Sequence, residues 1–232
     1  MSRSRGRSRG TRLRSAGAVL ISVLLAVLLA AGCGSDGSSG PDGSSGTAKP
    51  APSELNGNTD PTYRGVVLTP PRPRPQFTLT DTAGREFKFG AETAGKPTLL
   101  FFGFTHCPDV CPTTLADIAN GLRQVPAAVR AATQIVFVTT DVKRDTAPVI
   151  KSYLDKFDAG LPNEFIGLRG TQSGIDAAQV AARVTLAEDE GRTHSAQVLL
   201  YGTDDYARVA FLQSTNGAAQ IAHDLPLVAE AK

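Results

Sequence analysis

Cysteine, methionine and tryptophan are scarce in this 232-residue chain, and their scarcity narrows its chemistry. The chain has no tryptophan, its one methionine is Met1, and its three cysteines are Cys33, Cys107 and Cys111. A soft-metal site therefore cannot be built from methionines, and such chemistry would have to use Cys107 and Cys111. The C-x-x-C-H pattern that attaches haem does not occur either.

Acidic residues are missing from the N-terminus. Residues 1–15 contain six arginines and no acid, and an uncharged, mostly apolar stretch follows at residues 16–31. This is the layout of an export signal. The stretch is short for a membrane-spanning helix, although a retained anchor stays open as an alternative. No adjacent arginine pair is present, which argues against the twin-arginine route.

Gly32–Cys33 resembles the cleavage site of bacterial lipoproteins, in which the cysteine becomes the lipidated first residue. We therefore predict that residues 1–32 are an export signal of lipoprotein type. The protein would then be exported and lipid-anchored through Cys33 to the outer face of the cytoplasmic membrane. Removing residues 1–32 would leave 18 basic against 22 acidic residues, a net charge of about −4. Nucleic-acid binding then has no electrostatic support.

Large apolar residues are almost absent from Gly34 to about Asp60, where glycine, serine, proline and asparagine predominate. Such a segment cannot bury enough surface to become ordered. We predict a flexible tether at residues 33–61 and one globular domain at residues 62–232. The alternation of proline and arginine at residues 70–75 is expected to form a stiffer approach to that domain.

Apolar periodicities in the domain predict a series of strands and helices. We expect hairpins at residues 77–89 and 196–212, and buried strands at 98–104 and 134–140. Helices are expected after Pro112, after Asp145 as N-cap, at 172–182, and from about Asn216 with an interruption at Pro226. The helix after Asp145 should turn one set of residues inward: Val149, Ile150, Tyr153, Leu154 and Phe157. This order predicts a thioredoxin-like α/β fold, a central mixed sheet flanked by helices with an N-terminal hairpin.

Two cysteines, each followed by proline, lie directly after the first buried strand, in the sequence THCPDVCP at residues 105–112. Proline disfavours the helical region for the residue before it and is tolerated in the first turn of a helix. Residues 107–111 are therefore expected to form a loop between a strand and a helix, and not a helix face. The N-terminus of the following helix would favour thiolates, so the pair could hold a soft cation or close into a disulfide.

The segments around these cysteines resemble the Sco/SenC family. The run LLFFGFTHCPDVCPTTL at residues 99–115 looks like the signature of that family. Residues 137–146 (FVTTDVKRDT), 164–170 (EFIGLRG) and 193–195 (THS) are similar to other family segments. The resemblance extends from about Phe77 to Leu225. The chain departs from the family pattern at Val142 and Ala147, where proline is usual, and at Thr193, where aspartate is usual.

Sco/SenC proteins are thioredoxin-like, copper-binding assembly factors for cytochrome c oxidase. The resemblance implies one copper ion per chain, Cu(I) or Cu(II), held by Cys107, Cys111 and His194. It also implies delivery to the binuclear copper site of the copper-bearing oxidase subunit, with other copper chaperones as further partners. Two thiolates and an imidazole suit copper, although zinc remains chemically possible.

Two other uses of Cys107 and Cys111 stay open. They could form a structural disulfide, as exported proteins often contain. They could also be the catalytic pair of a thiol–disulfide oxidoreductase that reduces the cysteines of the oxidase subunit, so the sequence leaves open whether the chain is an enzyme. We favour copper delivery, because His194 is superfluous to dithiol exchange and the spacing is C-x₃-C, not C-x-x-C. A peroxidase is disfavoured, because the Thr-x-x-Cys spacing is absent.

The remaining polar candidates are expected to support the site without binding the metal. We place His106 and Asp109 around the metal ligands, where Asp109 could complement the helix N-terminus, tune the thiolates or meet a partner. Asp141, Arg144 and Asp145 are expected to form a structural cluster of ion pairs and caps. His223 is expected to be structural or exposed.

Overall fold

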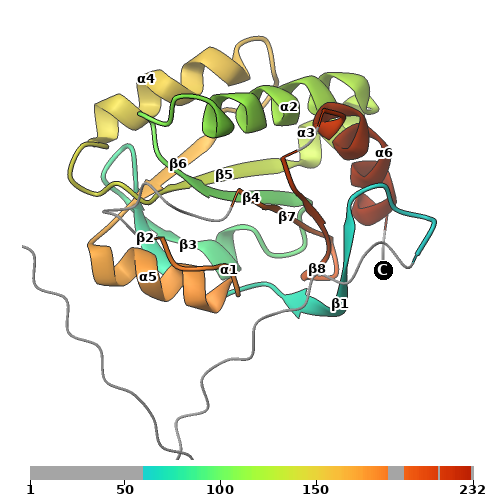
Figure 1. Cartoon of the computed structure of the whole chain (residues 1–232), viewed down its shortest axis with the longest axis horizontal. Coiled ribbons are helices and arrows are strands. Elements are labelled where there is room, and N and C mark those ends of the chain that lie inside the picture. The colour runs from blue at the N-terminus through green and yellow to red at the C-terminus, as the bar shows by residue number, and fades with distance from the viewer. Residues whose placement is uncertain (1–59, 188–195, 214, 231–232) are drawn as a thin grey trace, which may run out of the picture. The chain divides into compact units, whose positions relative to one another are not determined.

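A single mixed sheet organises the domain. The computed structural model describes residues 60–187, 196–213 and 215–230, and eight strands of this part of the chain pair in the order β1-β8-β7-β4-β5-β6-β2-β3 (Figure 1). The strands are β1 (Val66–Pro73), β2 (Thr78–Asp81), β3 (Glu86–Lys88), β4 (Thr98–Gly103), β5 (Gln134–Thr139), β6 (Ile166–Arg169), β7 (Val198–Tyr201) and β8 (Tyr206–Phe211).

The centre of the sheet is parallel and its flanks are antiparallel. β4 pairs in parallel with β5, from Thr98 beside Gln134 to Gly103 beside Thr139. β5 pairs in parallel with β6, while β7 runs antiparallel to β4 on its other side. Every residue of β4 is buried, as expected for a continuous apolar strand covered on both faces. The carboxyl ends of β4 and β5 and the start of β7 therefore meet at one edge of the sheet.

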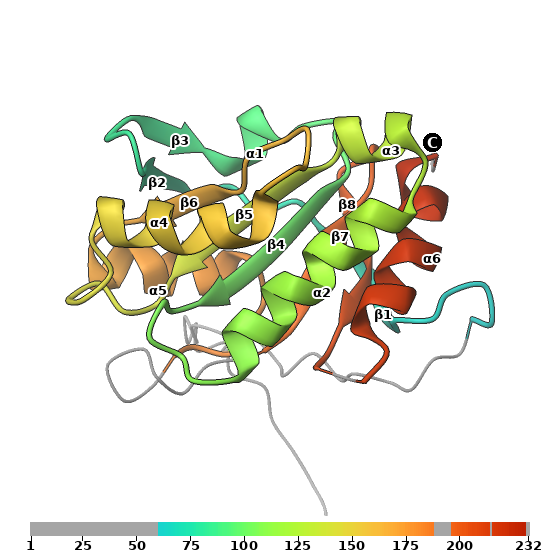
Figure 2. The same ribbon diagram turned by 90° about the horizontal axis from the view of Figure 1, so that it is seen from above.

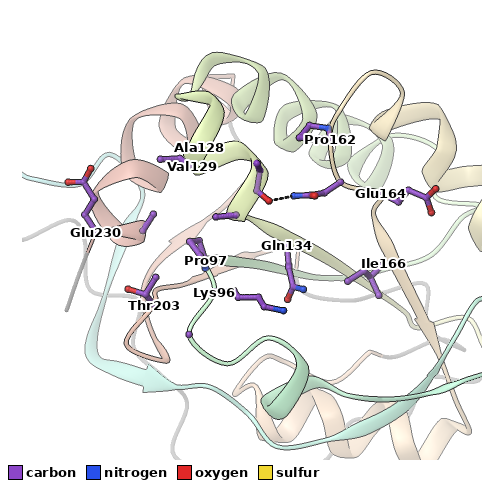
Figure 3. Close-up of a pocket in the computed structure, with 15 residues that line it drawn as sticks. Lys96, Pro97, Ala128, Val129, Gln134, Pro162, Glu164, Ile166, Thr203 and Glu230 are labelled. Carbon is purple, nitrogen blue, oxygen red and sulfur yellow. Dashed lines mark hydrogen bonds between the residues drawn. The ribbon is translucent and has the colours of Figure 1, made fainter.

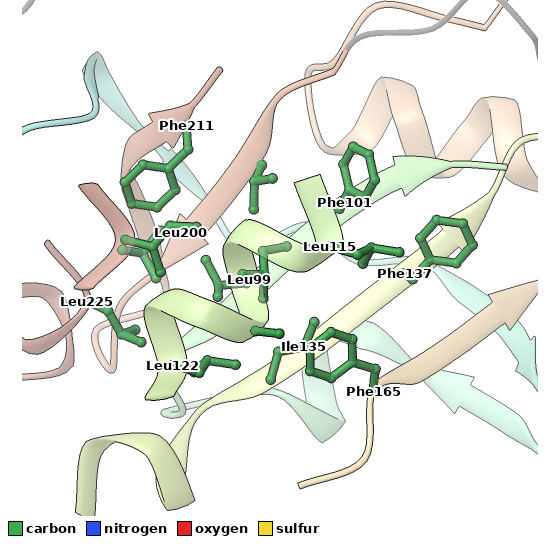
Figure 4. Close-up of a cluster of buried hydrophobic side chains, with 14 of the residues drawn as sticks. Leu99, Phe101, Leu115, Leu122, Ile135, Phe137, Phe165, Leu200, Phe211 and Leu225 are labelled. Atoms are coloured by element: carbon green, nitrogen blue, oxygen red, sulfur yellow. The ribbon is translucent and has the colours of Figure 1, made fainter. Parts of the chain in front are cut away.

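Six helices of the described residues cover the two faces of this sheet. They are α1 (Phe89–Glu92), α2 (Val110–Gln124), α3 (Ala127–Ala132), α4 (Ala147–Asp158), α5 (Gln172–Ala181) and α6 (Gly217–Ala229). Figures 1 and 2 show α2 and α4 on one face and α5 on the other. Alternate residues of β4 point to opposite faces, so Leu99 and Phe101 pack toward α2, α4 and α6, whereas Leu100 and Phe102 pack toward α5. Figure 4 shows the first of these clusters, including Leu115 and Leu122 of α2.

The predicted thioredoxin-like α/β fold, with a central mixed sheet flanked by helices, is confirmed. The hairpins, the two buried strands and the helices of the prediction are present with ends shifted by a few residues. Residues 70–73 were wrongly expected to be only an approach to the domain, because they belong to β1, which pairs with β8. Proline is tolerated there because β1 is an edge strand.

Two details of the predicted helices are wrong. α6 continues through Pro226 to Ala229 instead of breaking, because Leu225 and Val228 on either side of the proline are fully buried and hold the last turn of the helix on the core. Val149 of α4 does not face inward, since 36% of it is exposed, while Ile150 and Leu154 are buried. α3 and β6 were not predicted.

The predicted export signal (residues 1–32), residues 33–59 of the predicted tether (33–61) and the proposed lipidation site Cys33 lie outside the described residues. Within the part of the chain that is described, no helix combines the length and the apolar character needed to cross a membrane.

Candidate functional site

The two cysteines lie at the sheet edge where β4 ends and α2 begins. A loop follows Gly103, and the backbone N–H of Cys107 donates to the carbonyl of Phe104 at 3.3 Å. α2 starts at Val110, so Cys111 is in the first helical turn and Pro112 follows it there. The expectation that residues 107–111 form only a loop is therefore wrong at Val110 and Cys111. Pro112 disfavours the helical region for Cys111 without excluding it, and proline is itself tolerated in the first turn of a helix, so Cys111 can take the second helical position.

Cys111 is packed into the core, and a glycine makes room for its sulfur. Cys111 has no exposed surface, whereas Cys107 is partly buried. A Cβ atom at Gly103 would lie 2.9 Å from the Sγ of Cys111 and 3.0 Å from the ring of Phe137. Any larger residue at position 103 would displace the sulfur. Glycine in an otherwise apolar strand was the sequence signal of this contact.

The sulfurs are held in different surroundings. Both cysteines are thiols in this structure, and the backbone N–H of Cys111 donates to the Sγ of Cys107 at 3.4 Å. A backbone donor at a helix N-terminus complements negative charge on that sulfur. Burial raises the pKa of the Cys111 thiol far above its ordinary value, and Cys107 and Asp145 raise it further, while a backbone hydrogen bond with Phe104 opposes them. A cation bound by both sulfurs would therefore release the Cys111 proton.

Asp145 fastens the dithiol loop to the neighbouring strand. Its carboxylate has no exposed surface and accepts hydrogen bonds from the Thr105 N–H at 2.9 Å and the Thr105 hydroxyl at 2.6 Å. It also accepts from the Thr139 hydroxyl, at the end of β5, at 2.6 Å. The prediction that Asp145 is the N-cap of α4 is wrong, because Thr146 has that position. Thr105 donates two of these hydrogen bonds and Thr139 donates one, and sequence reasoning singled out neither residue.

Removing this carboxylate should destabilise the protein. Asp145→Ala leaves the partly buried Thr105 N–H and the buried Thr139 hydroxyl without their acceptor, and such a group costs about 1–3 kcal/mol when it is fully buried. We expect the free energy of unfolding of the reduced chain to fall by about 2–4 kcal/mol in Asp145→Ala and by less in Asp145→Asn, which keeps one acceptor oxygen. Urea unfolding followed by circular dichroism measures both. A loss below about 1 kcal/mol in the alanine variant would contradict this role.

The supporting residues occupy the predicted neighbourhood with different contacts. The half-exposed His106 ring has its Nδ1 3.0 Å from the Thr105 hydroxyl and 3.5 Å from the Asp145 carboxylate. Asp109 is the exposed N-cap residue of α2, and its side chain accepts from the Thr113 hydroxyl at 3.4 Å instead of capping a backbone N–H. The predicted ion pair between Asp141 and Arg144 is present.

His223 lies on α6, away from the cysteines. Its Nδ1 is 2.7 Å from the buried carboxylate of Asp224, which also accepts from the backbone N–H groups of Arg64 and Gly65. This arrangement joins the start of the domain to α6 and confirms the structural interpretation of His223.

The third predicted ligand, His194, lies outside the described residues. Among the residues that are described, no three cysteine, histidine or acidic side chains come together in a way that could hold a metal ion. The structure thus brings Cys107 and Cys111 together and provides two sulfur donors at this edge of the sheet.

A separate cavity of about 820 Å³ lies at the opposite edge, where β4 begins. Figure 3 shows Pro97, Val129 and Ile166 around it. Neither cysteine nor histidine occurs among the described residues that line it. This cavity therefore offers no soft ligands and is not part of the dithiol site.

The sequence matches one protein-family model and several curated proteins. The family model described as SCO1/SenC matches residues 68–230. A Stutzerimonas stutzeri protein, provisionally named as copper-binding, is 39% identical over 151 residues, which cover 61% of this chain and 71% of that protein. The mitochondrial protein SCO2 of Saccharomyces cerevisiae is 34% identical over 122 residues, which cover 53% of this chain. The match spans only 37% of the yeast protein's length.

Solved structures share the fold. The copper-bound structure of ScoI from Bradyrhizobium japonicum is 32% identical, has a TM-score of 0.55, and is matched over 67% of this chain and 98% of its own. A structure of BsSco, whose title describes a disulfide switch in a member of the Sco family of cytochrome c oxidase assembly proteins, is 21% identical with a TM-score of 0.53. It is matched over 70% of this chain and 96% of its own, and it supports the fold alone.

Proposed function

The chain belongs to the SCO1/SenC family, and on that basis we propose that it is a copper metallochaperone that delivers copper to the binuclear copper site of cytochrome c oxidase. One copper ion per chain, Cu(I) or Cu(II), would be held by Cys107, Cys111 and His194. The observation that carries the proposal is the pair of thiols at the β4–α2 junction, where soft sulfur donors suit copper among first-row metals.

The position of β7 supports His194 as the third ligand. Val198, at the start of β7, pairs with Phe101 of β4, close to the end of β4 and the dithiol loop. His194 precedes Val198 by four residues, and four residues span at most about 14 Å. The proposed ligand is therefore joined by a short piece of chain to a strand that starts beside the dithiol loop.

Copper titration of the reduced chain tests the proposal. We expect saturation at one copper per chain, with an absorption band from sulfur-to-copper charge transfer, and weaker binding of zinc in a parallel titration. Binding should release the proton of Cys111, because its raised pKa keeps that thiol protonated at neutral pH. Failure of the reduced chain to bind copper at this stoichiometry would refute the proposed metallochaperone function.

The different burial of the two sulfurs favours a second candidate function. Cys107 is accessible and Cys111 is fully buried, as in a dithiol in which one sulfur meets the partner and the other resolves the mixed disulfide. The protein could thus be a thiol–disulfide oxidoreductase that reduces the cysteines of the oxidase subunit. The two functions exclude each other at any instant, because a disulfide has no thiolate to give to a metal.

We further propose that Cys33 anchors the exported protein by its lipid to the outer face of the cytoplasmic membrane, close to a membrane-embedded partner. Cys33→Ser should block processing of residues 1–32 and change the membrane fractionation of the protein, because a serine cannot carry the thioether-linked lipid. Gel mobility and carbonate extraction measure both. Cleavage and fractionation like those of the unmodified protein would contradict a lipoprotein.

A further inference from the structure

A groove of about 420 Å³ lies beside the dithiol loop, between Thr105 and His106 of the loop and the outward face of α4. Figure 2 shows the loop after β4 and the start of α4 at the same edge of the sheet. Pro148, Val149, Ser152 and Lys156 line the α4 side. Val149, Ser152 and Lys156 recur every three or four positions, and Pro148 is one helical turn before Ser152, so the four residues form one continuous stripe on the helix. The stripe leads from the dithiol loop along α4.

The groove combines an apolar floor with a positive end. Val149 is 36% exposed although it is apolar. The ring of Tyr153 also lines the groove, and its other contacts are with the rings of Phe137 and Phe157 in the core. Lys156 is exposed and makes no ion pair with a described residue, whereas Lys151, on the same helix, pairs with Asp155 at 2.6 Å. No acidic residue is present among the described residues that line the groove.

From this charge pattern we infer that the groove docks the extended, acidic segment of a partner protein that presents a cysteine to Cys107. The inference rests on the proposed function for one point, that the partner brings a cysteine to this site. An apolar side chain of the segment lies on Val149 and Tyr153, and an acidic side chain meets Lys156. Lys156 is seven positions after Val149, which is about 10 Å along a helix. An extended segment covers this distance in about three residues.

Such docking promotes thiol–disulfide exchange in either direction. Attack of a partner thiolate on the oxidised chain is the reverse of the step in which a chain that reduces a partner disulfide releases the reduced partner cysteine, and it begins with Cys107 and Cys111 joined by a disulfide. In the oxidised chain, the incoming thiolate attacks the Sγ of Cys107, because Cys111 is buried. A bond forms between the partner sulfur and Cys107, the bond between Cys107 and Cys111 breaks, and its electron pair leaves on Cys111, which takes a proton. The partner cysteine is oxidised and Cys111 is reduced.

Two blocked synthetic hexapeptides test the groove. Each has one cysteine, a valine directly after it, and either a glutamate or a lysine three positions after the valine. The measured quantity is the ratio of their rate constants for mixed-disulfide formation with the oxidised full chain at low ionic strength. Lys156→Glu should lower the glutamate-to-lysine ratio at least about fivefold, because it reverses the charge that meets the glutamate or lysine of the peptide. High salt should reduce this effect.

Lys151→Glu is the matched control, with the same charge change on the same helix outside the groove, and it should alter the ratio less than about twofold. An equal change of the glutamate-to-lysine ratio in the two lysine variants, or an unchanged ratio in Lys156→Glu, would overturn the proposal that the groove docks an acidic segment. Copper titration of Lys156→Glu separates this outcome from a failure of the proposed function. The groove predicts one copper per chain in that variant, as in the unmodified protein, because Lys156 supplies no ligand. Copper binding lost in Lys156→Glu alone would also overturn the assignment of Lys156 to docking.

Discussion

The double variant Cys107→Ser, Cys111→Ser is expected to lose tight copper binding altogether. Serine offers a neutral, hard oxygen in place of a soft thiolate. A structural zinc site of four ligands is worth roughly 10–16 kcal/mol, or about 3 kcal/mol for each ligand. Loss of two sulfurs should therefore weaken copper binding by roughly four orders of magnitude. Titration of the reduced chain with a competing chelator measures the change.

Two further variants make this result specific. Cys33→Ser removes the remaining cysteine and should leave copper stoichiometry and affinity unchanged. The single variant Cys107→Ser separates loss of a metal ligand from loss of the fold. Cys107 is only partly buried, whereas Cys111 fills space against Gly103, so the change at Cys107 should disturb the packing less. Copper bound at full stoichiometry by the double variant would show that the dithiol is not the metal site.

The elements that carry the dithiol were predictable because their signals are local. Residues 98–103 form a continuous apolar run, and proline at position 112 predicts the start of a helix. The helix was predicted to begin after Pro112, but α2 begins at Val110 and so includes Cys111. The prediction failed because proline disfavours the helical region for the residue before it without excluding that residue from the first turn. β1 was not predicted, because its prolines and arginines are not typical of a strand. The segment is a strand through its pairing with β8 at the edge of the sheet.

Contacts between distant residues could not be predicted in this way. Asp145 precedes a helix and has the residue type of an N-cap, yet its acceptors serve Thr105, 40 residues away, and Thr139. The buried carboxylate became recognisable only when the parallel pairing of β4 and β5 placed both threonines beside it. Val149 likewise lies at the border of the apolar face of α4, and periodicity does not specify which border residues are covered.

His194 separates the two candidate functions. If it is the third ligand, His194→Ala should weaken copper binding about a hundredfold, by the same scale of about 3 kcal/mol for each ligand. Thiol–disulfide exchange by Cys107 and Cys111 should change less than about threefold, because it depends chiefly on the thiolate fraction and on access to the sulfurs. The expected consequence for the partner is a cytochrome c oxidase that contains little copper in its binuclear site.

The measurement compares His194→Ala with His223→Ala, a matched control whose imidazole contacts Asp224 on α6 instead of the dithiol. For each variant, we would determine the copper content of the oxidase and the rate at which the reduced chain opens a model disulfide. Copper delivery requires low oxidase copper with normal exchange in His194→Ala alone, because only the metal needs the third ligand. A reductase needs only the two sulfurs, so normal oxidase copper in His194→Ala, with copper lost only in the cysteine variants, would move the assignment to thiol reduction.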